Sequence, residues 1–209
     1  MTSRENNALF FKAFVVGPIE TNCYVVYDPS TKKGGLIDPG EYSSEIKEYI
    51  EKKELEVLWI INTHGHPDHI SGDAGFGYPV MIHPLDEPLL NDPEWNSLSL
   101  STDPLKPVLA ERLLEDGTTV PLGNFDLEVI HTPGHTPGSI SIKCGNLLFS
   151  GDTLFFEGVG RTDLPGGDPD LLKVSIKEKL MVLDDPVRVF PGHGPETTIG
   201  HERKNNPYL

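Results

Sequence analysis

Residues 62–72 concentrate side chains of the kind that bind metal ions. The segment reads NTHGHPDHISG, and His64, His66, Asp68 and His69 fall within six residues directly after an apolar run. Imidazole and carboxylate groups without a thiolate suit zinc, iron or manganese in a reactive site. Two histidines two residues apart share one face of an extended chain but not of a helix. Pro67 then bends the chain, so the cluster can supply two metal ions rather than one.

Three further ligand-type side chains each follow an apolar run and sit among glycines and prolines. They are His135 in HTPGHTPGS, Asp152 in SGDT and His193 in PGHG. Loops at sheet ends are where a rigid scaffold presents functional groups. On chemistry alone, His131 is an alternative to His135. The candidate metal ligands are therefore His64, His66, Asp68, His69, His135, Asp152 and His193.

Length and composition predict one globular domain with a buried core. The chain has 209 residues, of which 37% are hydrophobic, and 32 acidic against 17 basic residues give a formal net charge of −15. Such an acidic chain disfavours nucleic-acid binding, which requires basic patches. Cys23 and Cys144 form no CxxC pattern, and no run approaches the roughly 18 apolar residues of a membrane span. We expect a cytoplasmic protein, with an organellar location as the alternative, and no membrane partner.

Short apolar runs between glycines and prolines predict two halves of mixed strand and helix. In the first half we expect strands over residues 9–16, 22–27, 36–38, 56–62 and 79–83, and helices over 43–53 and 84–90. In the second we expect strands over 125–130, 140–143, 146–150 and 186–190, and helices over 168–180 and 199–205. The two halves would pack sheet to sheet with helices outside. Residues 92–108, rich in proline and serine, are predicted to form a lid beside the site.

The ligand-bearing segments resemble the metallo-β-lactamase superfamily. HGHPDH at 64–69, PGHT at 133–136, SGDT at 150–153 and PGHG at 191–194 occur in the order of that family, and the similarity begins near residue 14. The resemblance implies an α/β (α+β) fold, a four-layer αββα sandwich, in a single domain over residues 1–209. It implies two divalent metal ions, zinc first and iron or manganese as alternatives.

The family pattern also assigns roles to the candidate ligands. It implies that one metal is bound by His64, His66 and His135, and the other by Asp68, His69 and His193, with Asp152 bridging the two. The PGHT match favours His135 over His131. Two such ions lower the pKa of a bridging water toward neutrality, which provides a hydroxide for hydrolysis. Asp68 is expected to be catalytic as well, by accepting a proton or orienting the hydroxide.

Within the superfamily the chain is most similar to small glyoxalase II-like hydrolases. GRTDLPGGD at 160–168 and the C-terminal tail carry this similarity. It implies hydrolysis of a small acyl thioester such as S-2-hydroxyacylglutathione. Longer members hold glutathione with a C-terminal helical domain, which we expect this chain, ending at Leu209, to lack. Arg161 matches the position of a glutathione-contacting lysine and is predicted to bind a substrate carboxylate.

Other activities share the same ligand positions. A persulfide dioxygenase of this fold would hold a single iron at the positions of His64, His135 and Asp152. A lactonase or β-lactamase-type hydrolase would apply the same chemistry to another acyl group. A non-catalytic metal-binding protein is disfavoured, because no ligand position of the family is missing. The sequence makes no prediction of the oligomeric state.

Overall fold

Two sheets of six strands each form the centre of the computed structural model, which describes residues 8–96 and 106–209. The first sheet has the order β1 (Phe10–Val16), β2 (Thr21–Tyr27), β3 (Lys33–Ile37), β4 (Glu56–Ile61), β5 (Val80–Ile82) and β6 (Ala110–Leu113). The second has the order β14 (Thr197–Thr198), β13 (Arg188–Pro191), β10 (Leu147–Gly151), β9 (Ile140–Cys144), β8 (Phe125–His131) and β7 (Thr119–Leu122). A small hairpin pairs β11 (Leu154–Phe155) with β12 (Gly158–Val159).

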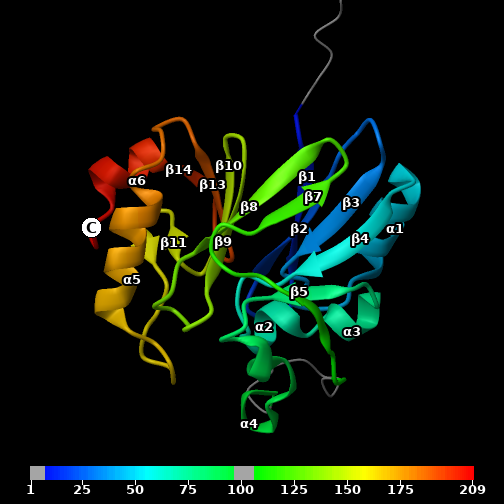
Figure 1. The fold of residues 1–209 in the computed structure, drawn as a ribbon, viewed down its shortest axis with the longest axis horizontal. Helices are drawn as coiled ribbons and strands as arrows, with labels where there is room; N and C mark the ends of the chain where they lie inside the picture. The colour runs from blue at the N-terminus through cyan, green and yellow to red at the C-terminus, as the bar shows by residue number, and fades with distance from the viewer. Residues whose placement is uncertain (1–7, 97–105) are drawn as a thin grey trace, which may run out of the picture.

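Helices cover the outer faces of both sheets (Figure 1). The first sheet is covered by α1 (Ser44–Lys53), and the second by α5 (Pro169–Ser175), which continues as the π-helix η2 (Ile176–Leu180), and by α6 (Ile199–Asn205). The remaining short helices are α2 (Pro67–Ile70), α3 (Asp73–Phe76), η1 (Glu87–Asn91) and α4 (Pro93–Asn96).

Alternation along β2 shows how the layers are built. All seven residues of this strand are buried. Tyr24 and Val26 belong to the apolar cluster between the two sheets, whereas Cys23 and Val25 belong to the cluster under α1. A third cluster joins the second sheet to α5, η2 and α6. Since successive side chains of a strand point to opposite faces, the strand has apolar layers on both sides. The helix–sheet–sheet–helix arrangement confirms the predicted αββα fold.

The predicted start of the third strand was too late. β3 begins at Lys33 and includes Gly34 and Gly35, which lie before the predicted start of the strand at residue 36. The indole ring of Trp59 on β4 lies directly over Gly35, where a Cβ atom would overlap it. Gly35 therefore gives a large inward side chain room on the neighbouring strand and does not mark a turn.

Three other predictions of local structure need correction or lie outside the described residues. The helix predicted over 84–90 is instead a turn followed by the 3₁₀ helix η1. The edge strands β6 and β7 were not predicted, because β6 has little apolar alternation and β7 contains a proline. Within the predicted lid, α4 is described, whereas residues 97–105 lie outside the described part of the chain.

A buried carboxylate ties the two sheets together at the end of β2 opposite Thr21. Asp28 accepts hydrogen bonds from the backbone N–H groups of Ser30 (2.8 Å) and Asn124 (2.9 Å), and from both of their side chains. Asn124 lies in the turn between β7 and β8 of the second sheet. Burial alone would raise the pKa of Asp28, but these hydrogen bonds outweigh it and hold the pKa well below its usual range.

Replacing this carboxylate should destabilise the fold in a pH-dependent way. At pH 7, Asp28→Asn is expected to lower the free energy of unfolding by about 1–3 kcal/mol, because an amide leaves at least one buried N–H without an acceptor. The native pKa is depressed, so this contribution is present above the unfolded carboxyl pKa of about 3.9 and is lost as the pH falls toward the native pKa. Urea unfolding of both proteins between pH 7 and pH 2.5 measures the difference. A difference that does not shrink in acid would contradict the charge assigned to Asp28.

Candidate metal centre

All seven predicted ligands lie at one end of the two sheets. The loop after β4 carries His64 and His66, and α2 carries Asp68 and His69. His135, Asp152 and His193 come from loops that follow β8, β10 and β13 of the second sheet. Three-residue sets of these side chains, with ligand atoms within 4.8 Å of one another, are His64–His66–His135, His64–His69–Asp152 and Asp68–His69–His193. The structure therefore brings together residues separated by more than a hundred positions.

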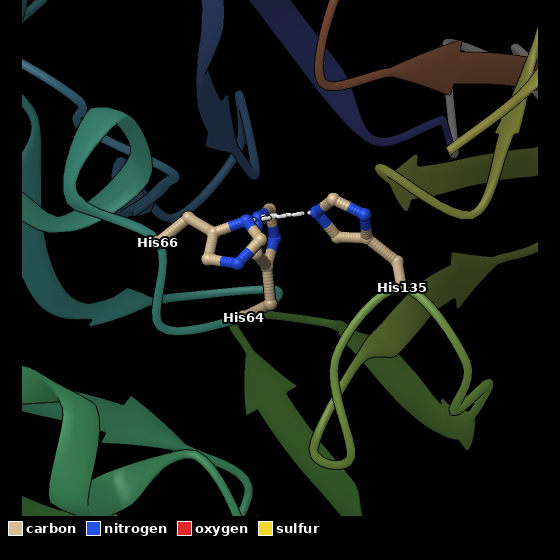
Figure 2. Close-up of side chains that lie close together, drawn as sticks. All are labelled: His64, His66 and His135. Carbon is tan, nitrogen blue, oxygen red and sulfur yellow. Dashed lines mark hydrogen bonds between the residues drawn. The ribbon is translucent and has the colours of Figure 1, made fainter. Parts of the chain in front are cut away.

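Three imidazoles from two loops converge in the first set (Figure 2). Nε2 of His135 lies 3.2 Å from Nε2 of His64 and 2.9 Å from Nδ1 of His66. All three side chains are buried. Burial, together with the neighbouring imidazoles, lowers the pKa of His64 well below its usual value and that of His66 to about 3. The His64 and His66 rings are therefore neutral, and each offers a nitrogen lone pair, as a metal ligand must.

The hydrogen bonds of the outward-facing nitrogens fix the tautomers of two of these rings. Nδ1 of His135 lies 2.7 Å from the carbonyl oxygen of Arg161, which can only accept a hydrogen bond, so Nδ1 donates and Nε2 is the nitrogen that faces the centre. The Thr63 hydroxyl donates to Asp38, so it accepts from Nδ1 of His64 at 3.1 Å, and Nε2 of His64 faces the centre too. Nε2 of His64 and Nε2 of His135 thus face each other across 3.2 Å. A cation between them could be coordinated by both nitrogens, so the donor set fits a metal ion.

A carboxylate joins two imidazoles in the set Asp68–His69–His193, which is called the second set from here on. Oδ2 of Asp68 lies 3.3 Å from Nε2 of His69 and 3.1 Å from Nε2 of His193. The outward nitrogens are held here as well, since Nδ1 of His69 lies 3.0 Å from Asp38 and Nδ1 of His193 lies 3.2 Å from the carbonyl oxygen of Ile19. An imidazole whose outer nitrogen is held by a carboxylate or carbonyl is the common pattern of histidine metal ligands.

Asp152 lies between the two sets. Its Oδ1 is 3.4 Å from Nε2 of His69, and its Oδ2 is 3.6 Å from Nε2 of His135 and 3.7 Å from Nε2 of His193. Oδ1 is buried and makes no hydrogen bond within the described residues. A buried carboxylate oxygen without a donor is expensive unless a cation is near. This position suits a bridge between two metal ions.

The three carboxylates around His69 carry more negative charge than its imidazole can balance. Burial would lower the pKa of His69, but the carboxylates of Asp68, Asp152 and Asp38 outweigh it and raise that pKa well above its usual value. The His69 imidazole is therefore charged when no metal is bound. A divalent cation would neutralise the same carboxylates more completely, so metal binding and proton release from this set are linked.

Two glycines let backbone approach the ligands. A Cβ atom on Gly192 would overlap Oδ1 of Asp152, and one on Gly40 would overlap the carbonyl oxygen of Asp68. The loops that carry His193 and Asp38 can close around the centre only because these positions lack a side chain.

The centre opens into a cavity of about 580 Å³. The walls include apolar side chains from three regions: Pro18, Ile19, Trp95, Phe155, Val159 and Leu164. Trp95 of α4 stacks on His66, with ring centroids 5.0 Å apart, so part of the predicted lid region lies beside the site. Arg161 also lines the cavity, and its Nε and Nη2 donate to Asp163 at 2.7 and 2.8 Å.

Other histidines lie away from the centre. His131 stacks on His83 with ring centroids 4.1 Å apart, and its Nε2 lies 2.9 Å from the carbonyl oxygen of Pro137. Neither belongs to a ligand set among the described residues. The position of His135 rather than His131 at the centre agrees with the family pattern.

Asp38 is a buried aspartate outside the ligand sets that contacts a ligand imidazole directly. Asp38 contacts the His69 ring, whereas Asp73 accepts a hydrogen bond from Asn62 at 3.2 Å and contacts no imidazole ligand. Sequence reasoning missed Asp86, a fully buried carboxylate that bonds to both histidine loops. No pattern around Asp86 distinguishes it from an ordinary helix-capping aspartate.

A family comparison matches most of the chain. Residues 16–193 match the model of the metallo-beta-lactamase superfamily, and the chain belongs to this superfamily. Its members bind divalent metals, and the chain is a metallo-hydrolase of this group. None of the helices in the described residues has the length and apolarity needed to cross a membrane.

Curated relatives match almost end to end. The chain is 39% identical to a probable metallo-hydrolase, YqgX, of Bacillus subtilis, with 93% of this chain and 94% of the relative covered. It is 33% identical to the hydroxyacylglutathione hydrolase GloC of Haemophilus influenzae, with 93% and 95% covered.

Solved structures share the fold. BLEG-1, a B3 metallo-beta-lactamase, superposes with a TM-score of 0.87 at 39% identity, over 96% of this chain and 99% of its own. TTHA1623 in a di-iron-bound form gives a TM-score of 0.81 at 38% identity, over 95% and 100%. ETHE1 from Myxococcus xanthus gives 0.77 at 26% identity, over 95% and 83%.

Removing the central carboxylate should empty both metal positions. We expect Asp152→Ala to lose metal content and hydrolytic activity together, because this side chain lies within 3.7 Å of ligands from both sets. Elemental analysis of the purified proteins measures the metal. Asp163→Ala, which removes an exposed carboxylate outside the ligand sets, should keep the wild-type metal content. Full metal content in Asp152→Ala would contradict the dinuclear assignment.

Proposed function

We propose that the protein hydrolyses acyl thioesters, with S-2-hydroxyacylglutathione as the first candidate, at a centre of two divalent ions, of which zinc is expected first. The observation that carries this proposal is the placement of Asp152 between two complete ligand sets at the mouth of one cavity. The similarity to a hydroxyacylglutathione hydrolase supports the substrate class. Iron and manganese are the alternatives for the metal, since the donor set contains no thiolate.

The bound ions would supply a nucleophilic hydroxide at neutral pH and a Lewis acid for the carbonyl oxygen. Asp68 is the ligand that we propose to take part in the reaction itself. Its side chain is 24% exposed and lines the cavity, and its Oδ2 accepts a hydrogen bond from the Thr21 hydroxyl at 3.2 Å. This donor helps to hold the carboxylate in one orientation, ready to accept a proton or orient the attacking group.

The chemistry of the walls suits a leaving group that needs no proton. Among the described residues that line the cavity, Glu41 and Arg161 are the charged side chains besides the candidate ligands. No lysine or tyrosine is found among these described lining residues. A thiolate leaves without a general acid, whereas an amine does not. The walls therefore favour a thioester over an amide.

Arg161 is proposed to bind a carboxylate of the substrate. Asp163 holds Nε and Nη2 of its guanidinium, which orients the group and leaves Nη1 available. Planar guanidinium groups pair well with carboxylates. We also propose that the enzyme acts in the cytoplasm on a small-molecule substrate, where its two free buried cysteines would remain reduced.

The alternatives use the same ligands. A mononuclear iron oxygenase would need only His64, His135 and Asp152, whose side chains lie together at the centre. The similarity to BLEG-1, a B3 metallo-beta-lactamase, makes β-lactam hydrolysis the other alternative. The complete second ligand set supports the dinuclear hydrolase over the oxygenase.

A substrate panel separates these activities. The metal-loaded protein is expected to hydrolyse S-D-lactoylglutathione with a kcat/KM of ~10⁴ M⁻¹s⁻¹ or above, followed by the loss of thioester absorbance. The same preparation is tested with a chromogenic β-lactam and, by oxygen uptake, with glutathione persulfide. Asp68→Asn controls for background activity. Faster turnover of either alternative substrate than of the thioester would overturn the proposed function.

Arg161 should affect substrate binding and not chemistry. Arg161→Met is expected to raise KM for S-D-lactoylglutathione by about 5- to 30-fold with little change in kcat, because a charge-assisted hydrogen bond to a carboxylate is lost. S-lactoyl-N-acetylcysteamine, which has no carboxylate, should be hydrolysed equally well by both proteins. Equal effects on the two substrates would show that Arg161 supports the loop and not the substrate carboxylate.

A further inference from the structure

Asp86 is a buried carboxylate that does not do what its position in the chain predicts. It immediately precedes η1, where an aspartate ordinarily accepts a hydrogen bond from the first turn of its own helix. Its side chain makes no such bond. The residue is completely buried, and a buried carboxylate must find its partners elsewhere.

The partners of Asp86 lie on the two loops that carry the first ligand set. Its Oδ2 accepts the backbone N–H of Gly65 at 2.9 Å and the hydroxyl of Thr136 at 2.6 Å. Its Oδ1 accepts the backbone N–H of Gly138 at 2.7 Å. Gly65 stands between His64 and His66, and Thr136 follows His135. One carboxylate is therefore bonded to the neighbours of all three imidazoles shown in Figure 2.

Packing leaves little freedom in these contacts. A Cβ atom on Gly138 would lie 2.5 Å from Oδ1 of Asp86, and one on Gly65 would lie 2.6 Å from Cβ of Leu89 on η1. Both loops thus press backbone directly against the start of η1. Thr136 is also held by Ser139, whose Oγ lies 2.7 Å from the threonine hydroxyl and 3.0 Å from the backbone nitrogen of Thr136.

We propose that Asp86 is a positioning residue that fixes the loop of His64 and His66 against the loop of His135, and so sets the affinity of this set for a divalent metal. This inference rests on the proposed metal-binding role of the three histidines. Asp86 touches neither the metal position nor the cavity; it acts through backbone N–H groups and one hydroxyl. The charged carboxylate matters because only it accepts from all three donors at once.

Zn²⁺ binding to the metal-free protein tests this role. Titration against a chromophoric chelator is expected to show a roughly 10- to 100-fold loss of affinity at one of the two sites in Asp86→Asn, the range seen when a partner outside the ligand shell is removed. The other site should keep its affinity. Thr136→Val, which removes one of the three hydrogen bonds, should give a smaller loss of several-fold at the same site.

A matched variant separates positioning from general destabilisation. Asp28→Asn also removes a buried carboxylate that joins two turns through backbone N–H groups, but at the far end of β2. It should lower stability while leaving Zn²⁺ affinity unchanged. Wild-type affinity in Asp86→Asn, or an equal loss in Asp28→Asn, would overturn the proposal. Should Asp86→Asn not fold, an unchanged affinity in Thr136→Val would overturn it.

The failure of the proposed metal centre would look different. In that case the wild-type protein, with Asp86 intact, would already fail to bind Zn²⁺ at two sites. Two-site binding in the wild type with a selective loss in Asp86→Asn supports both the centre and the positioning role.

Discussion

The crowding of lone pairs and carboxylates at one end of the two sheets is the interaction on which the rest of the structure depends. Nε2 of His64 lies 3.2 Å from Nε2 of His135, and three carboxylates surround His69. Neither arrangement is favourable unless positive charge lies between the groups. The fold must supply enough packing energy elsewhere to hold these groups in place, and the three apolar clusters do so.

Each ligand loop is fastened to another part of the chain. The loop of His193 is held by β2, where the backbone N–H of Asn22 donates to Gly192 at 2.7 Å and the hydroxyl of Tyr24 donates to Pro191 at 2.6 Å. Asp38 orders the start of the first ligand loop through Thr63 and orients His69. β2 belongs to one sheet, and the loop of His193 follows a strand of the other. The geometry of the centre therefore depends on how the two sheets pack against each other.

The cavity explains how one metal centre can be directed to a particular substrate. Its apolar walls come from segments outside the two six-stranded sheets: the turn after β1, α4 with Trp95, and the stretch from Phe155 to Leu164. The ligands are held by the rigid scaffold, whereas these segments can change without disturbing it. The chain is similar both to a hydroxyacylglutathione hydrolase (33% identical) and to a B3 metallo-beta-lactamase (39% identical), which fits this division.

The sequence predicted the parts of the fold whose signals are local. Helix α6 was predicted with its observed bounds, and β1, β2 and β8 within a residue or two. It did not predict β6 and β7, whose strand character comes from pairing at sheet edges. The ligand positions could be proposed because histidines and aspartates among glycines stand out. Asp86 could not, because its role depends on two loops that only the tertiary structure brings to it.

Anomalous X-ray diffraction from crystals of the Zn²⁺-loaded protein tests the central claim most directly. The account predicts two zinc peaks about 3.5–4 Å apart, one beside His64, His66 and His135, the other beside Asp68, His69 and His193, with Asp152 between them. A single peak, or two peaks that do not share Asp152, would contradict it.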